Sequence, residues 1–163
     1  MLYAAAVGAA RDPCLYVRLG VPDTLDGRFD VIGLYAFLLI RRLSGLPPPG
    51  AELAQAVFDA MFSDMDVNLR EMGVGDLSVG KRVRAMWEAF HGRSFAYERA
   101  MVAADHRALT AALARNVWRG AAAPHAADLA RLAFAQDAYL AKQDPAAFAA
   151  GRADFLSAGE ALR

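Results

Sequence analysis

The chain has 163 residues, of which 56% are hydrophobic, and this length and apolar content suit one domain with a single buried core. Eighteen Lys and Arg residues balance eighteen Asp and Glu residues, so the surface as a whole carries no net field that would collect nucleic acid or anionic lipid. Cys14 is the one cysteine, which excludes an internal disulfide and a cluster of thiolate metal ligands.

Apolar residues recur at helical spacing along the chain, and no stretch shows sustained alternation of β-branched and polar residues. The pattern predicts an all-α fold, a single-domain bundle of about seven to eight helices over residues 1–163. The predicted helices cover residues 2–11, 14–20, 28–44, 50–72, 78–91, 94–118, 124–143 and 145–158. Asp105 marks a candidate break inside the sixth of these helices.

Prolines, glycines and short polar side chains set the ends of these helices. The run Gly45–Gly50 (GLPPPG) predicts a non-helical connection, because three consecutive prolines fix φ and remove donors. Gly73 suits a left-handed helix cap, and Ser78 is the expected N-cap of the helix that follows. Asp144 is the expected N-cap of the last helix, with Pro145 in its first turn.

The longest apolar run, Val31–Ile40, predicts the central helix of the bundle, because it is apolar on nearly every side. It is bounded by Asp30 and Arg41 and is about half as long as the roughly 20 residues that a membrane-spanning helix needs. The apolar segment Met1–Ala10 has no positively charged start and does not match a signal peptide. We therefore expect a soluble, cytoplasmic protein.

The tail of the chain is patterned less sharply than its middle. Residues 121–163 are rich in alanine, and we expect them to be helical but to pack more loosely. The run Gly120–Pro124 (GAAAP) is a candidate flexible joint at the start of this tail.

The fourth predicted helix has two distinct faces when it is drawn at about 100° per residue. On its solvent face, Asp66 and Arg70 are spaced for an i,i+4 ion pair. The opposite face begins apolar and then carries Asp64, Asn68 and Glu71 at i, i+4 and i+7. A carboxylate against a core costs several kcal/mol unless it is paired or hydrogen-bonded. These three polar side chains therefore need partners.

Basic residues stand just beyond the turn that follows this helix. Lys81, Arg82 and Arg84 lie at the start of the next predicted helix, and the short turn Gly73–Gly75 suits an antiparallel hairpin. Two interpretations follow. In the first, Lys81, Arg82 and the three polar side chains form an internal network that fixes the hairpin angle. In the second, they rim an apolar cleft that receives a segment of a partner protein.

The same hairpin carries more aromatic and methionine side chains than one buried face requires. Methionine and aromatic side chains suit an adaptable surface for apolar partners. Candidate contacts to such a partner, with core packing as the alternative interpretation, are Phe58, Phe62, Met65 and Leu69.

No residue pattern identifies a catalytic, cofactor or metal site. Gly75–Arg82 (GDLSVGKR) has the spacing of a P-loop, but Arg82 stands where such a loop needs Ser or Thr for Mg²⁺. His91, His106 and His125 form no i,i+3 or i,i+4 pair that would hold a metal or haem iron. A helical haem-handling protein and a nucleotide-binding, enzyme-like protein are the alternatives to a binding protein.

One long block resembles a known family. Residues 53–83 (LAQAVFDAMFSDMDVNLREMGVGDLSVGKRV) are similar, without interruption, to the most distinctive block of the ubiquinol-cytochrome c chaperone family. Further segments that resemble the family are Leu19–Asp23 (LGVPD), Gly27–Asp30 (GRFD) and Phe37–Leu43 (FLLIRRL). The resemblance is strongest over residues 19–103 and looser over 121–163. Abundant alanine and scarce lysine are typical of a GC-rich bacterial genome, so we expect a bacterial member.

The resemblance implies a non-catalytic assembly chaperone that binds cytochrome b, or an early intermediate, during biogenesis of the cytochrome bc1 complex, which is respiratory complex III. Mitochondrial members of the family associate with the ribosome and act with a small partner protein, so a ribosome contact or a small partner protein is a candidate by analogy. We expect at most peripheral association with the inner membrane. The resemblance implies no cofactor. Candidate residues of the partner-binding surface, carried over from the matching block, are Asp64, Asp66, Arg70, Glu71, Asp76, Lys81 and Arg82.

Overall fold

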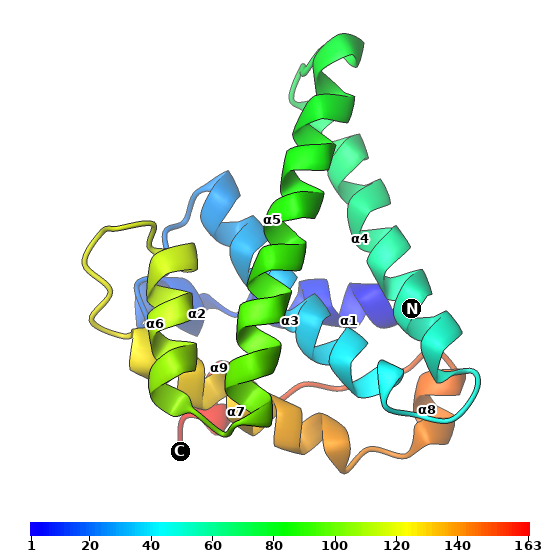
Figure 1. Ribbon diagram of the computed structural model, residues 1–163, viewed down its shortest axis with the longest axis vertical. Helices are drawn as coiled ribbons and strands as arrows, with labels where there is room; N and C mark the ends of the chain where they lie inside the picture. Colours follow the sequence, from blue (N-terminus) through cyan, green and yellow to red (C-terminus); the bar gives the residue numbers. More distant parts are fainter.

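The computed structural model describes residues 1–163 and confirms the all-α prediction, with nine helices and no strand (Figure 1). In chain order the helices are α1 (Leu2–Ala10), α2 (Pro13–Val17), α3 (Leu25–Ser44), α4 (Gly50–Glu71), α5 (Asp76–Val102), α6 (His106–Val117), α7 (Ala126–Ala141), α8 (Pro145–Ala149) and α9 (Ala158–Ala161). None of them combines the length and the apolar character that crossing a membrane requires.

Helix α3 is the centre of the bundle, as its apolar sequence predicts. Val31, Leu38 and Leu39 have no exposed surface, and Leu34 has 1%. Helices α1, α4, α5, α6 and α7 all pack against α3. Its burial on nearly every side therefore supplies much of the hydrophobic stabilisation of the fold.

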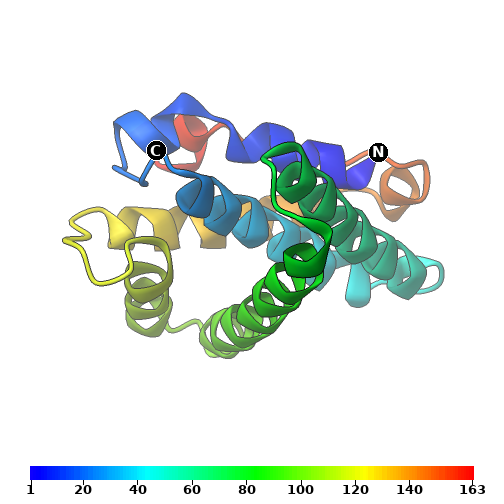
Figure 2. The same cartoon turned by 90° about the horizontal axis from the view of Figure 1, so that it is seen from above.

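Helices α4 and α5 form an antiparallel hairpin whose tip projects beyond the rest of the molecule (Figure 1). Gly73, at φ 84°, is the left-handed residue of the turn, as predicted, and the N–H of Val74 donates to the carbonyl of Leu69 at 3.0 Å. Helix α5 begins at Asp76, so Ser78 lies inside the helix and its predicted role as N-cap is wrong. Seen from above, α1 lies beside α4 of this hairpin (Figure 2).

Helix α5 is one continuous helix of 27 residues, where the sequence predicts a first helix over 78–91 and a second over 94–118. The predicted gap is wrong because Gly92 stays helical. A glycine inside a helix costs about 1 kcal/mol relative to alanine. Burial of Phe90 and Tyr97 on either side of Gly92 offsets that cost.

The helical run breaks near Asp105, which confirms the candidate break at that position. Ala104 adopts a positive φ of 49°, and the Asp105 carboxylate accepts a hydrogen bond from the backbone N–H of Ala108 at 2.9 Å. This bond is an N-cap, and it starts α6 in a new direction.

The last predicted helix, over 145–158, is wrong beyond its first five residues, although Asp144 caps it as expected. The chain then turns, and residues 152–157 have no regular secondary structure. The amide of Gln136 donates to the carbonyl of Leu156 at 2.7 Å and accepts from its N–H at 3.0 Å. Gln143 makes the same pair of bonds with Asp154, at 2.7 and 3.0 Å. These bonds replace those of a helix.

The tail after residue 121 packs tightly, contrary to the expectation of loose packing. Leu129, Leu132, Leu140 and Phe148 have no exposed surface. They belong to the same cluster of 37 buried hydrophobic residues as α3. The tail is therefore an integral part of the core.

Asp12 joins the two ends of the chain. One carboxylate oxygen accepts from the backbone N–H of Cys14 at 2.9 Å and caps α2. The other accepts from the N–H of Ala158 at 2.8 Å, at the start of α9. Helix α2 is thus held in place by a residue far along the chain.

The continuity of α5 gives a stability prediction. Gly92→Ala should raise the free energy of unfolding by about 1 kcal/mol, because alanine favours the helix and an added Cβ would meet no atom within 4 Å beyond its chain neighbours and the nearby backbone of α5. Urea unfolding followed by circular dichroism measures the change. Gly27→Ala is the control, because its Cβ would lie 2.0 Å from the carbonyl oxygen of Pro22 and the variant should lose stability. A destabilised Gly92→Ala variant would contradict an uninterrupted α5.

Candidate functional site

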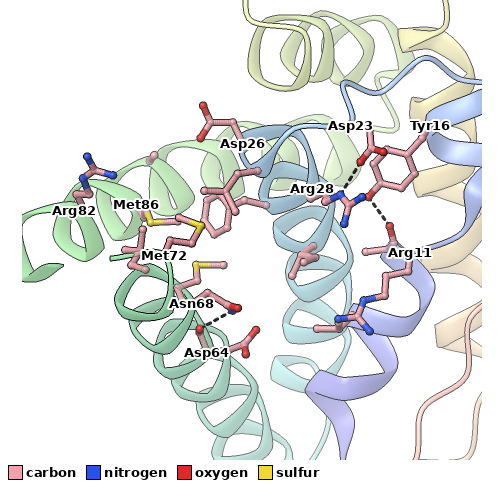
Figure 3. Close-up of a pocket in the computed structure, with 18 of the residues that line it drawn as sticks. Arg11, Tyr16, Asp23, Asp26, Arg28, Asp64, Asn68, Met72, Arg82 and Met86 are labelled. Atoms are coloured by element: carbon pink, nitrogen blue, oxygen red, sulfur yellow. Dashed lines mark hydrogen bonds and ion pairs between the residues drawn. The ribbon is translucent and has the colours of Figure 1, made fainter. Parts of the chain in front are cut away.

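A cleft of about 930 Å³ opens between the hairpin and the N-terminal helices. One wall, here called the N-terminal wall, comes from α1, α2 and the start of α3. The other wall comes from the second half of α4 and the first half of α5. Side chains from both walls approach the same space (Figure 3). The cleft thus joins segments that lie far apart in the sequence.

The interior of the cleft is mainly apolar, since 14 of its 24 lining residues are hydrophobic. Val17 is 86% exposed, and Leu25 and Met72 are each 52% exposed, so the rim offers apolar surface that a partner can cover. The apolar residues on the hairpin wall are Met65, Leu69, Met72, Ala85, Met86 and Ala89. Those on the N-terminal wall include Val7, Val17, Leu25, Phe29 and Ile32.

A buried carboxylate lies beside the cleft. Asp30 is 4% exposed and pairs with Arg93 of α5 and with Arg119, which follows α6. Arg119 lies 3.0 Å from Asp30 and 3.1 Å from Asp26. Burial raises the pKa of Asp30, and the positive charges of the two guanidinium groups act in the opposite direction. Both arginines line the cleft, so this cluster ties α3 to the elements around it.

The two walls touch at one edge of the cleft. The hydroxyl of Tyr3 on α1 donates to the carboxylate of Asp64 on α4 at 2.9 Å. Burial raises the pKa of Tyr3, and the hydrogen bond to Asp64 raises it further. On the N-terminal wall itself, Arg28 pairs with Asp23 at 2.6 Å.

The structure brings only part of the predicted partner surface to the cleft. Asp64 and Arg82 line it, whereas Glu71 and Lys81 do not. Asn68 also lines the cleft, but its amide donates to the backbone carbonyl of Asp64 at 2.7 Å. The internal network predicted among these five residues is therefore wrong. All five are exposed, so water satisfies the charges that have no protein partner.

The remaining residues of that predicted surface gather at the hairpin tip, away from the cleft. Arg70 lies 2.7 Å from Asp66, which confirms the expected i,i+4 pair, and it also pairs with Asp76 at the start of α5. Because these side chains are in contact with water, each pair adds little to the stability of the fold. Their structural role is to link the two helices across the turn.

The four candidate apolar contacts divide into two pairs. Met65 and Leu69 are 6% and 5% exposed, and both line the cleft. Phe58 and Phe62 instead pack against Phe90, with ring centroids 5.9 and 6.0 Å apart, and do not line it. The first pair therefore lies at the wall of the cleft, whereas the second pair holds the hairpin helices together.

The segment with P-loop spacing is helical from Asp76 onward, so it does not form a loop around a phosphate. The three histidines lie apart from one another. His91 stacks on Trp87 and His106 on Phe134, each with ring centroids 4.0 Å apart, while His125 lies 3.1 Å from Asp128. No group of three His, Cys, Asp or Glu side chains is arranged to hold a metal ion.

None of the partner-contacting residues that the sequence predicts lies on the N-terminal wall. Tyr3, Val7, Ala10 and Arg11 line the cleft from α1 and its C-cap. Their spacing of i, i+4, i+7 and i+8 places them on one face of a helix. That stripe was the available signal, but local spacing cannot show which other segment the face meets.

The chain is similar to known proteins over most of its length. The family described as Ubiquinol-cytochrome C chaperone matches residues 17–155. A curated protein of Xenopus laevis, ubiquinol-cytochrome-c reductase complex assembly factor 1, is 26% identical over 102 residues. The match covers 63% of this chain and 50% of that protein, so the chain spans about half the length of that relative.

A solved structure resembles the whole chain. The crystal structure of the Cbp3 homolog from Brucella abortus matches with a TM-score of 0.88 and 36% sequence identity. The match covers 98% of this chain and 88% of the other. The similarity therefore includes the alanine-rich tail, and the family match also extends well past residue 103.

The cluster around Asp30 gives a second stability prediction. Asp30→Ala would leave the guanidinium of Arg93, whose side chain is 19% exposed, without its buried carboxylate. The free energy of unfolding should fall by about 3–5 kcal/mol. Unfolding in guanidinium chloride measures this loss. Asp26→Ala is the control, because its exposed side chain pairs with the same Arg119 and should cost about 1 kcal/mol at most. Equal losses in the two variants would refute this account.

Proposed function

Because the chain belongs to the ubiquinol-cytochrome c chaperone family, we propose that it is a non-catalytic assembly chaperone of the cytochrome bc1 complex. Its client is cytochrome b, newly made or in an early assembly intermediate. The Xenopus laevis relative is named as an assembly factor of the same complex, which supports this proposal. The protein acts in the cytoplasm, at the surface of the inner membrane.

The cleft is the observation that carries this proposal. A newly made membrane subunit exposes apolar segments that water disfavours until they reach the bilayer or their partners. The walls of the cleft offer apolar side chains that are half exposed in the free chain, and a bound segment would remove both apolar surfaces from water. The cleft therefore suits temporary binding of an apolar segment.

Methionines make the cleft adaptable. Met65, Met72 and Met86 all line it, and unbranched methionine side chains repack around partners of different shape. Such a surface suits a chaperone, which must hold an apolar segment and later release it. A site built for catalysis instead needs side chains that are locked in one geometry.

A second set of contacts is proposed for the hairpin tip. Asp66, Arg70, Glu71, Asp76 and Lys81 lie outside the cleft on a part of the molecule that projects from the body (Figure 1). They remain accessible when the cleft is filled. We assign them to the ribosome or to a small partner protein, by analogy with the mitochondrial members of the family.

Filling the cleft should abolish the function without unfolding the protein. Ala85 is exposed and lines the cleft, so Ala85→Trp would occupy the space without displacing a core side chain. In a strain that lacks its own copy of the gene, this variant should fail to restore assembled bc1 complex. Native gels and haem difference spectra of membranes measure the complex and cytochrome b.

The matched control is Ala111→Trp, an exposed alanine on α6 that does not line the cleft. This variant should restore the bc1 complex, and both variants should keep the circular dichroism of the original chain. Normal bc1 levels with Ala85→Trp would exclude the cleft as the client site. Normal bc1 levels in the deletion strain itself would exclude the proposed function.

A further inference from the structure

We infer that the client segment held in the cleft is an amphipathic helix whose apolar face is flanked by acidic side chains. This inference rests on the proposed function and deepens it, because it specifies the chemistry of the segment that the cleft binds. Two observations support the inference: some charges in the cleft remain unpaired, and the walls are built from ridges of helices.

Most of the charged groups that line the cleft already neutralise one another. Arg28 is paired with Asp23. Arg93 and Arg119 share the buried carboxylate of Asp30, and Arg119 also pairs with Asp26. None of these groups needs a charge from a partner.

Two guanidinium groups in the cleft have no carboxylate partner. Arg11 lies on the N-terminal wall and Arg82 on the hairpin wall, both are exposed, and the guanidinium of neither forms an ion pair or hydrogen bond within the chain. Figure 3 shows them at opposite sides of the cleft. The one other free charge is Asp64, which accepts a hydrogen bond from Tyr3. The unpaired charges therefore leave a positive excess.

That excess selects for carboxylates on the partner. A guanidinium presents a planar set of donors that matches the two oxygens of a carboxylate. An apolar segment with acidic residues beside its apolar face would pair with Arg11 and Arg82 as it covers the walls. A segment with basic residues in those places would meet like charge and bind more weakly.

The walls also select for a helix. Met65, Leu69 and Met72 line the cleft at i, i+4 and i+7 of α4, so they form one ridge of that helix. The residues of α1 that line the opposite wall follow the same spacing. A third helix can lay its own ridge of side chains in the groove between two such ridges.

Three synthetic peptides test this inference. Each has about 18 residues, roughly five helical turns, and the same apolar face. The residues beside that face are Glu in the first peptide, Gln in the second and Lys in the third. Fluorescence anisotropy with the purified full chain measures each dissociation constant. We expect the Glu peptide to bind about fivefold more tightly than the Gln peptide, and the Lys peptide most weakly.

Charge variants of the chain identify the groups responsible. In the double variant Arg11→Gln, Arg82→Gln the preference for Glu over Gln should fall to near parity. In Arg11→Glu, Arg82→Glu it should reverse in favour of the Lys peptide, a gain of binding that misfolding cannot produce. Arg84→Gln is the matched control, because Arg84 pairs with Glu88 outside the cleft and its loss should leave the preference intact.

Equal binding of the three peptides would overturn the inference, and so would binding of none. The inference would also be overturned by a saturated fatty acid that competes with the Glu peptide and binds more tightly than that peptide does. The cleft would then be a lipid site. These outcomes are distinct from failure of the proposed function. With equal peptide binding, the cleft-filling Ala85→Trp variant would still block bc1 assembly if the chain is the proposed chaperone.

Discussion

The burial of α3 is the constraint on which the rest of the structure depends. A helix that is apolar on nearly every side needs neighbours all round it, and five other helices supply them. The ring is incomplete near the start of α3, where Phe29 and Ile32 line the cleft. The cleft is therefore the place where the core is left open, and the helix that organises the fold also lines this candidate site.

Charge keeps this opening stable in the free protein. Asp30 lies on α3 between Phe29 and Val31, and its two arginine partners reach it from α5 and from the segment after α6. A buried carboxylate is tolerated only with such partners. The cleft therefore combines an apolar interior with charged groups that mostly satisfy each other. That combination suits reversible binding of an apolar segment.

Local patterns predicted the parts of the fold that depend on local physics. The helical period of α3 and α4, the break at Asp105 and the cap at Asp144 depend on neighbouring residues. Gly92 misled the prediction because packing around it outweighs its helix propensity. The non-helical segment 152–157 could not be predicted, since Gln136 and Gln143 hold it through bonds between distant segments. The helix propensity of a short stretch of sequence does not show which distant residues will bind to it.

The part of the candidate site that lies within one segment could be predicted from the sequence, and the part that depends on docking of another segment could not. The resemblance led to the hairpin, where Asp64, Met65, Leu69 and Arg82 line the cleft. The opposite wall escaped prediction because a site between two segments is defined by their docking, and spacing within one segment does not specify its neighbour. The proposed role in bc1 assembly rests on the family. The structure supplies the cleft, with its apolar walls and its excess of positive charge.

The bond between Asp12 and Ala158 has a consequence for the order of events during translation. A ribosome makes Asp12 long before Ala158, since 146 positions separate them. The N-terminal wall of the cleft includes α2, and its anchor to α9 exists only after Ala158 has been made. A partial chain that ends before Ala158 therefore lacks the bond that ties α2 to α9, so this wall of the cleft becomes fully anchored only late in translation.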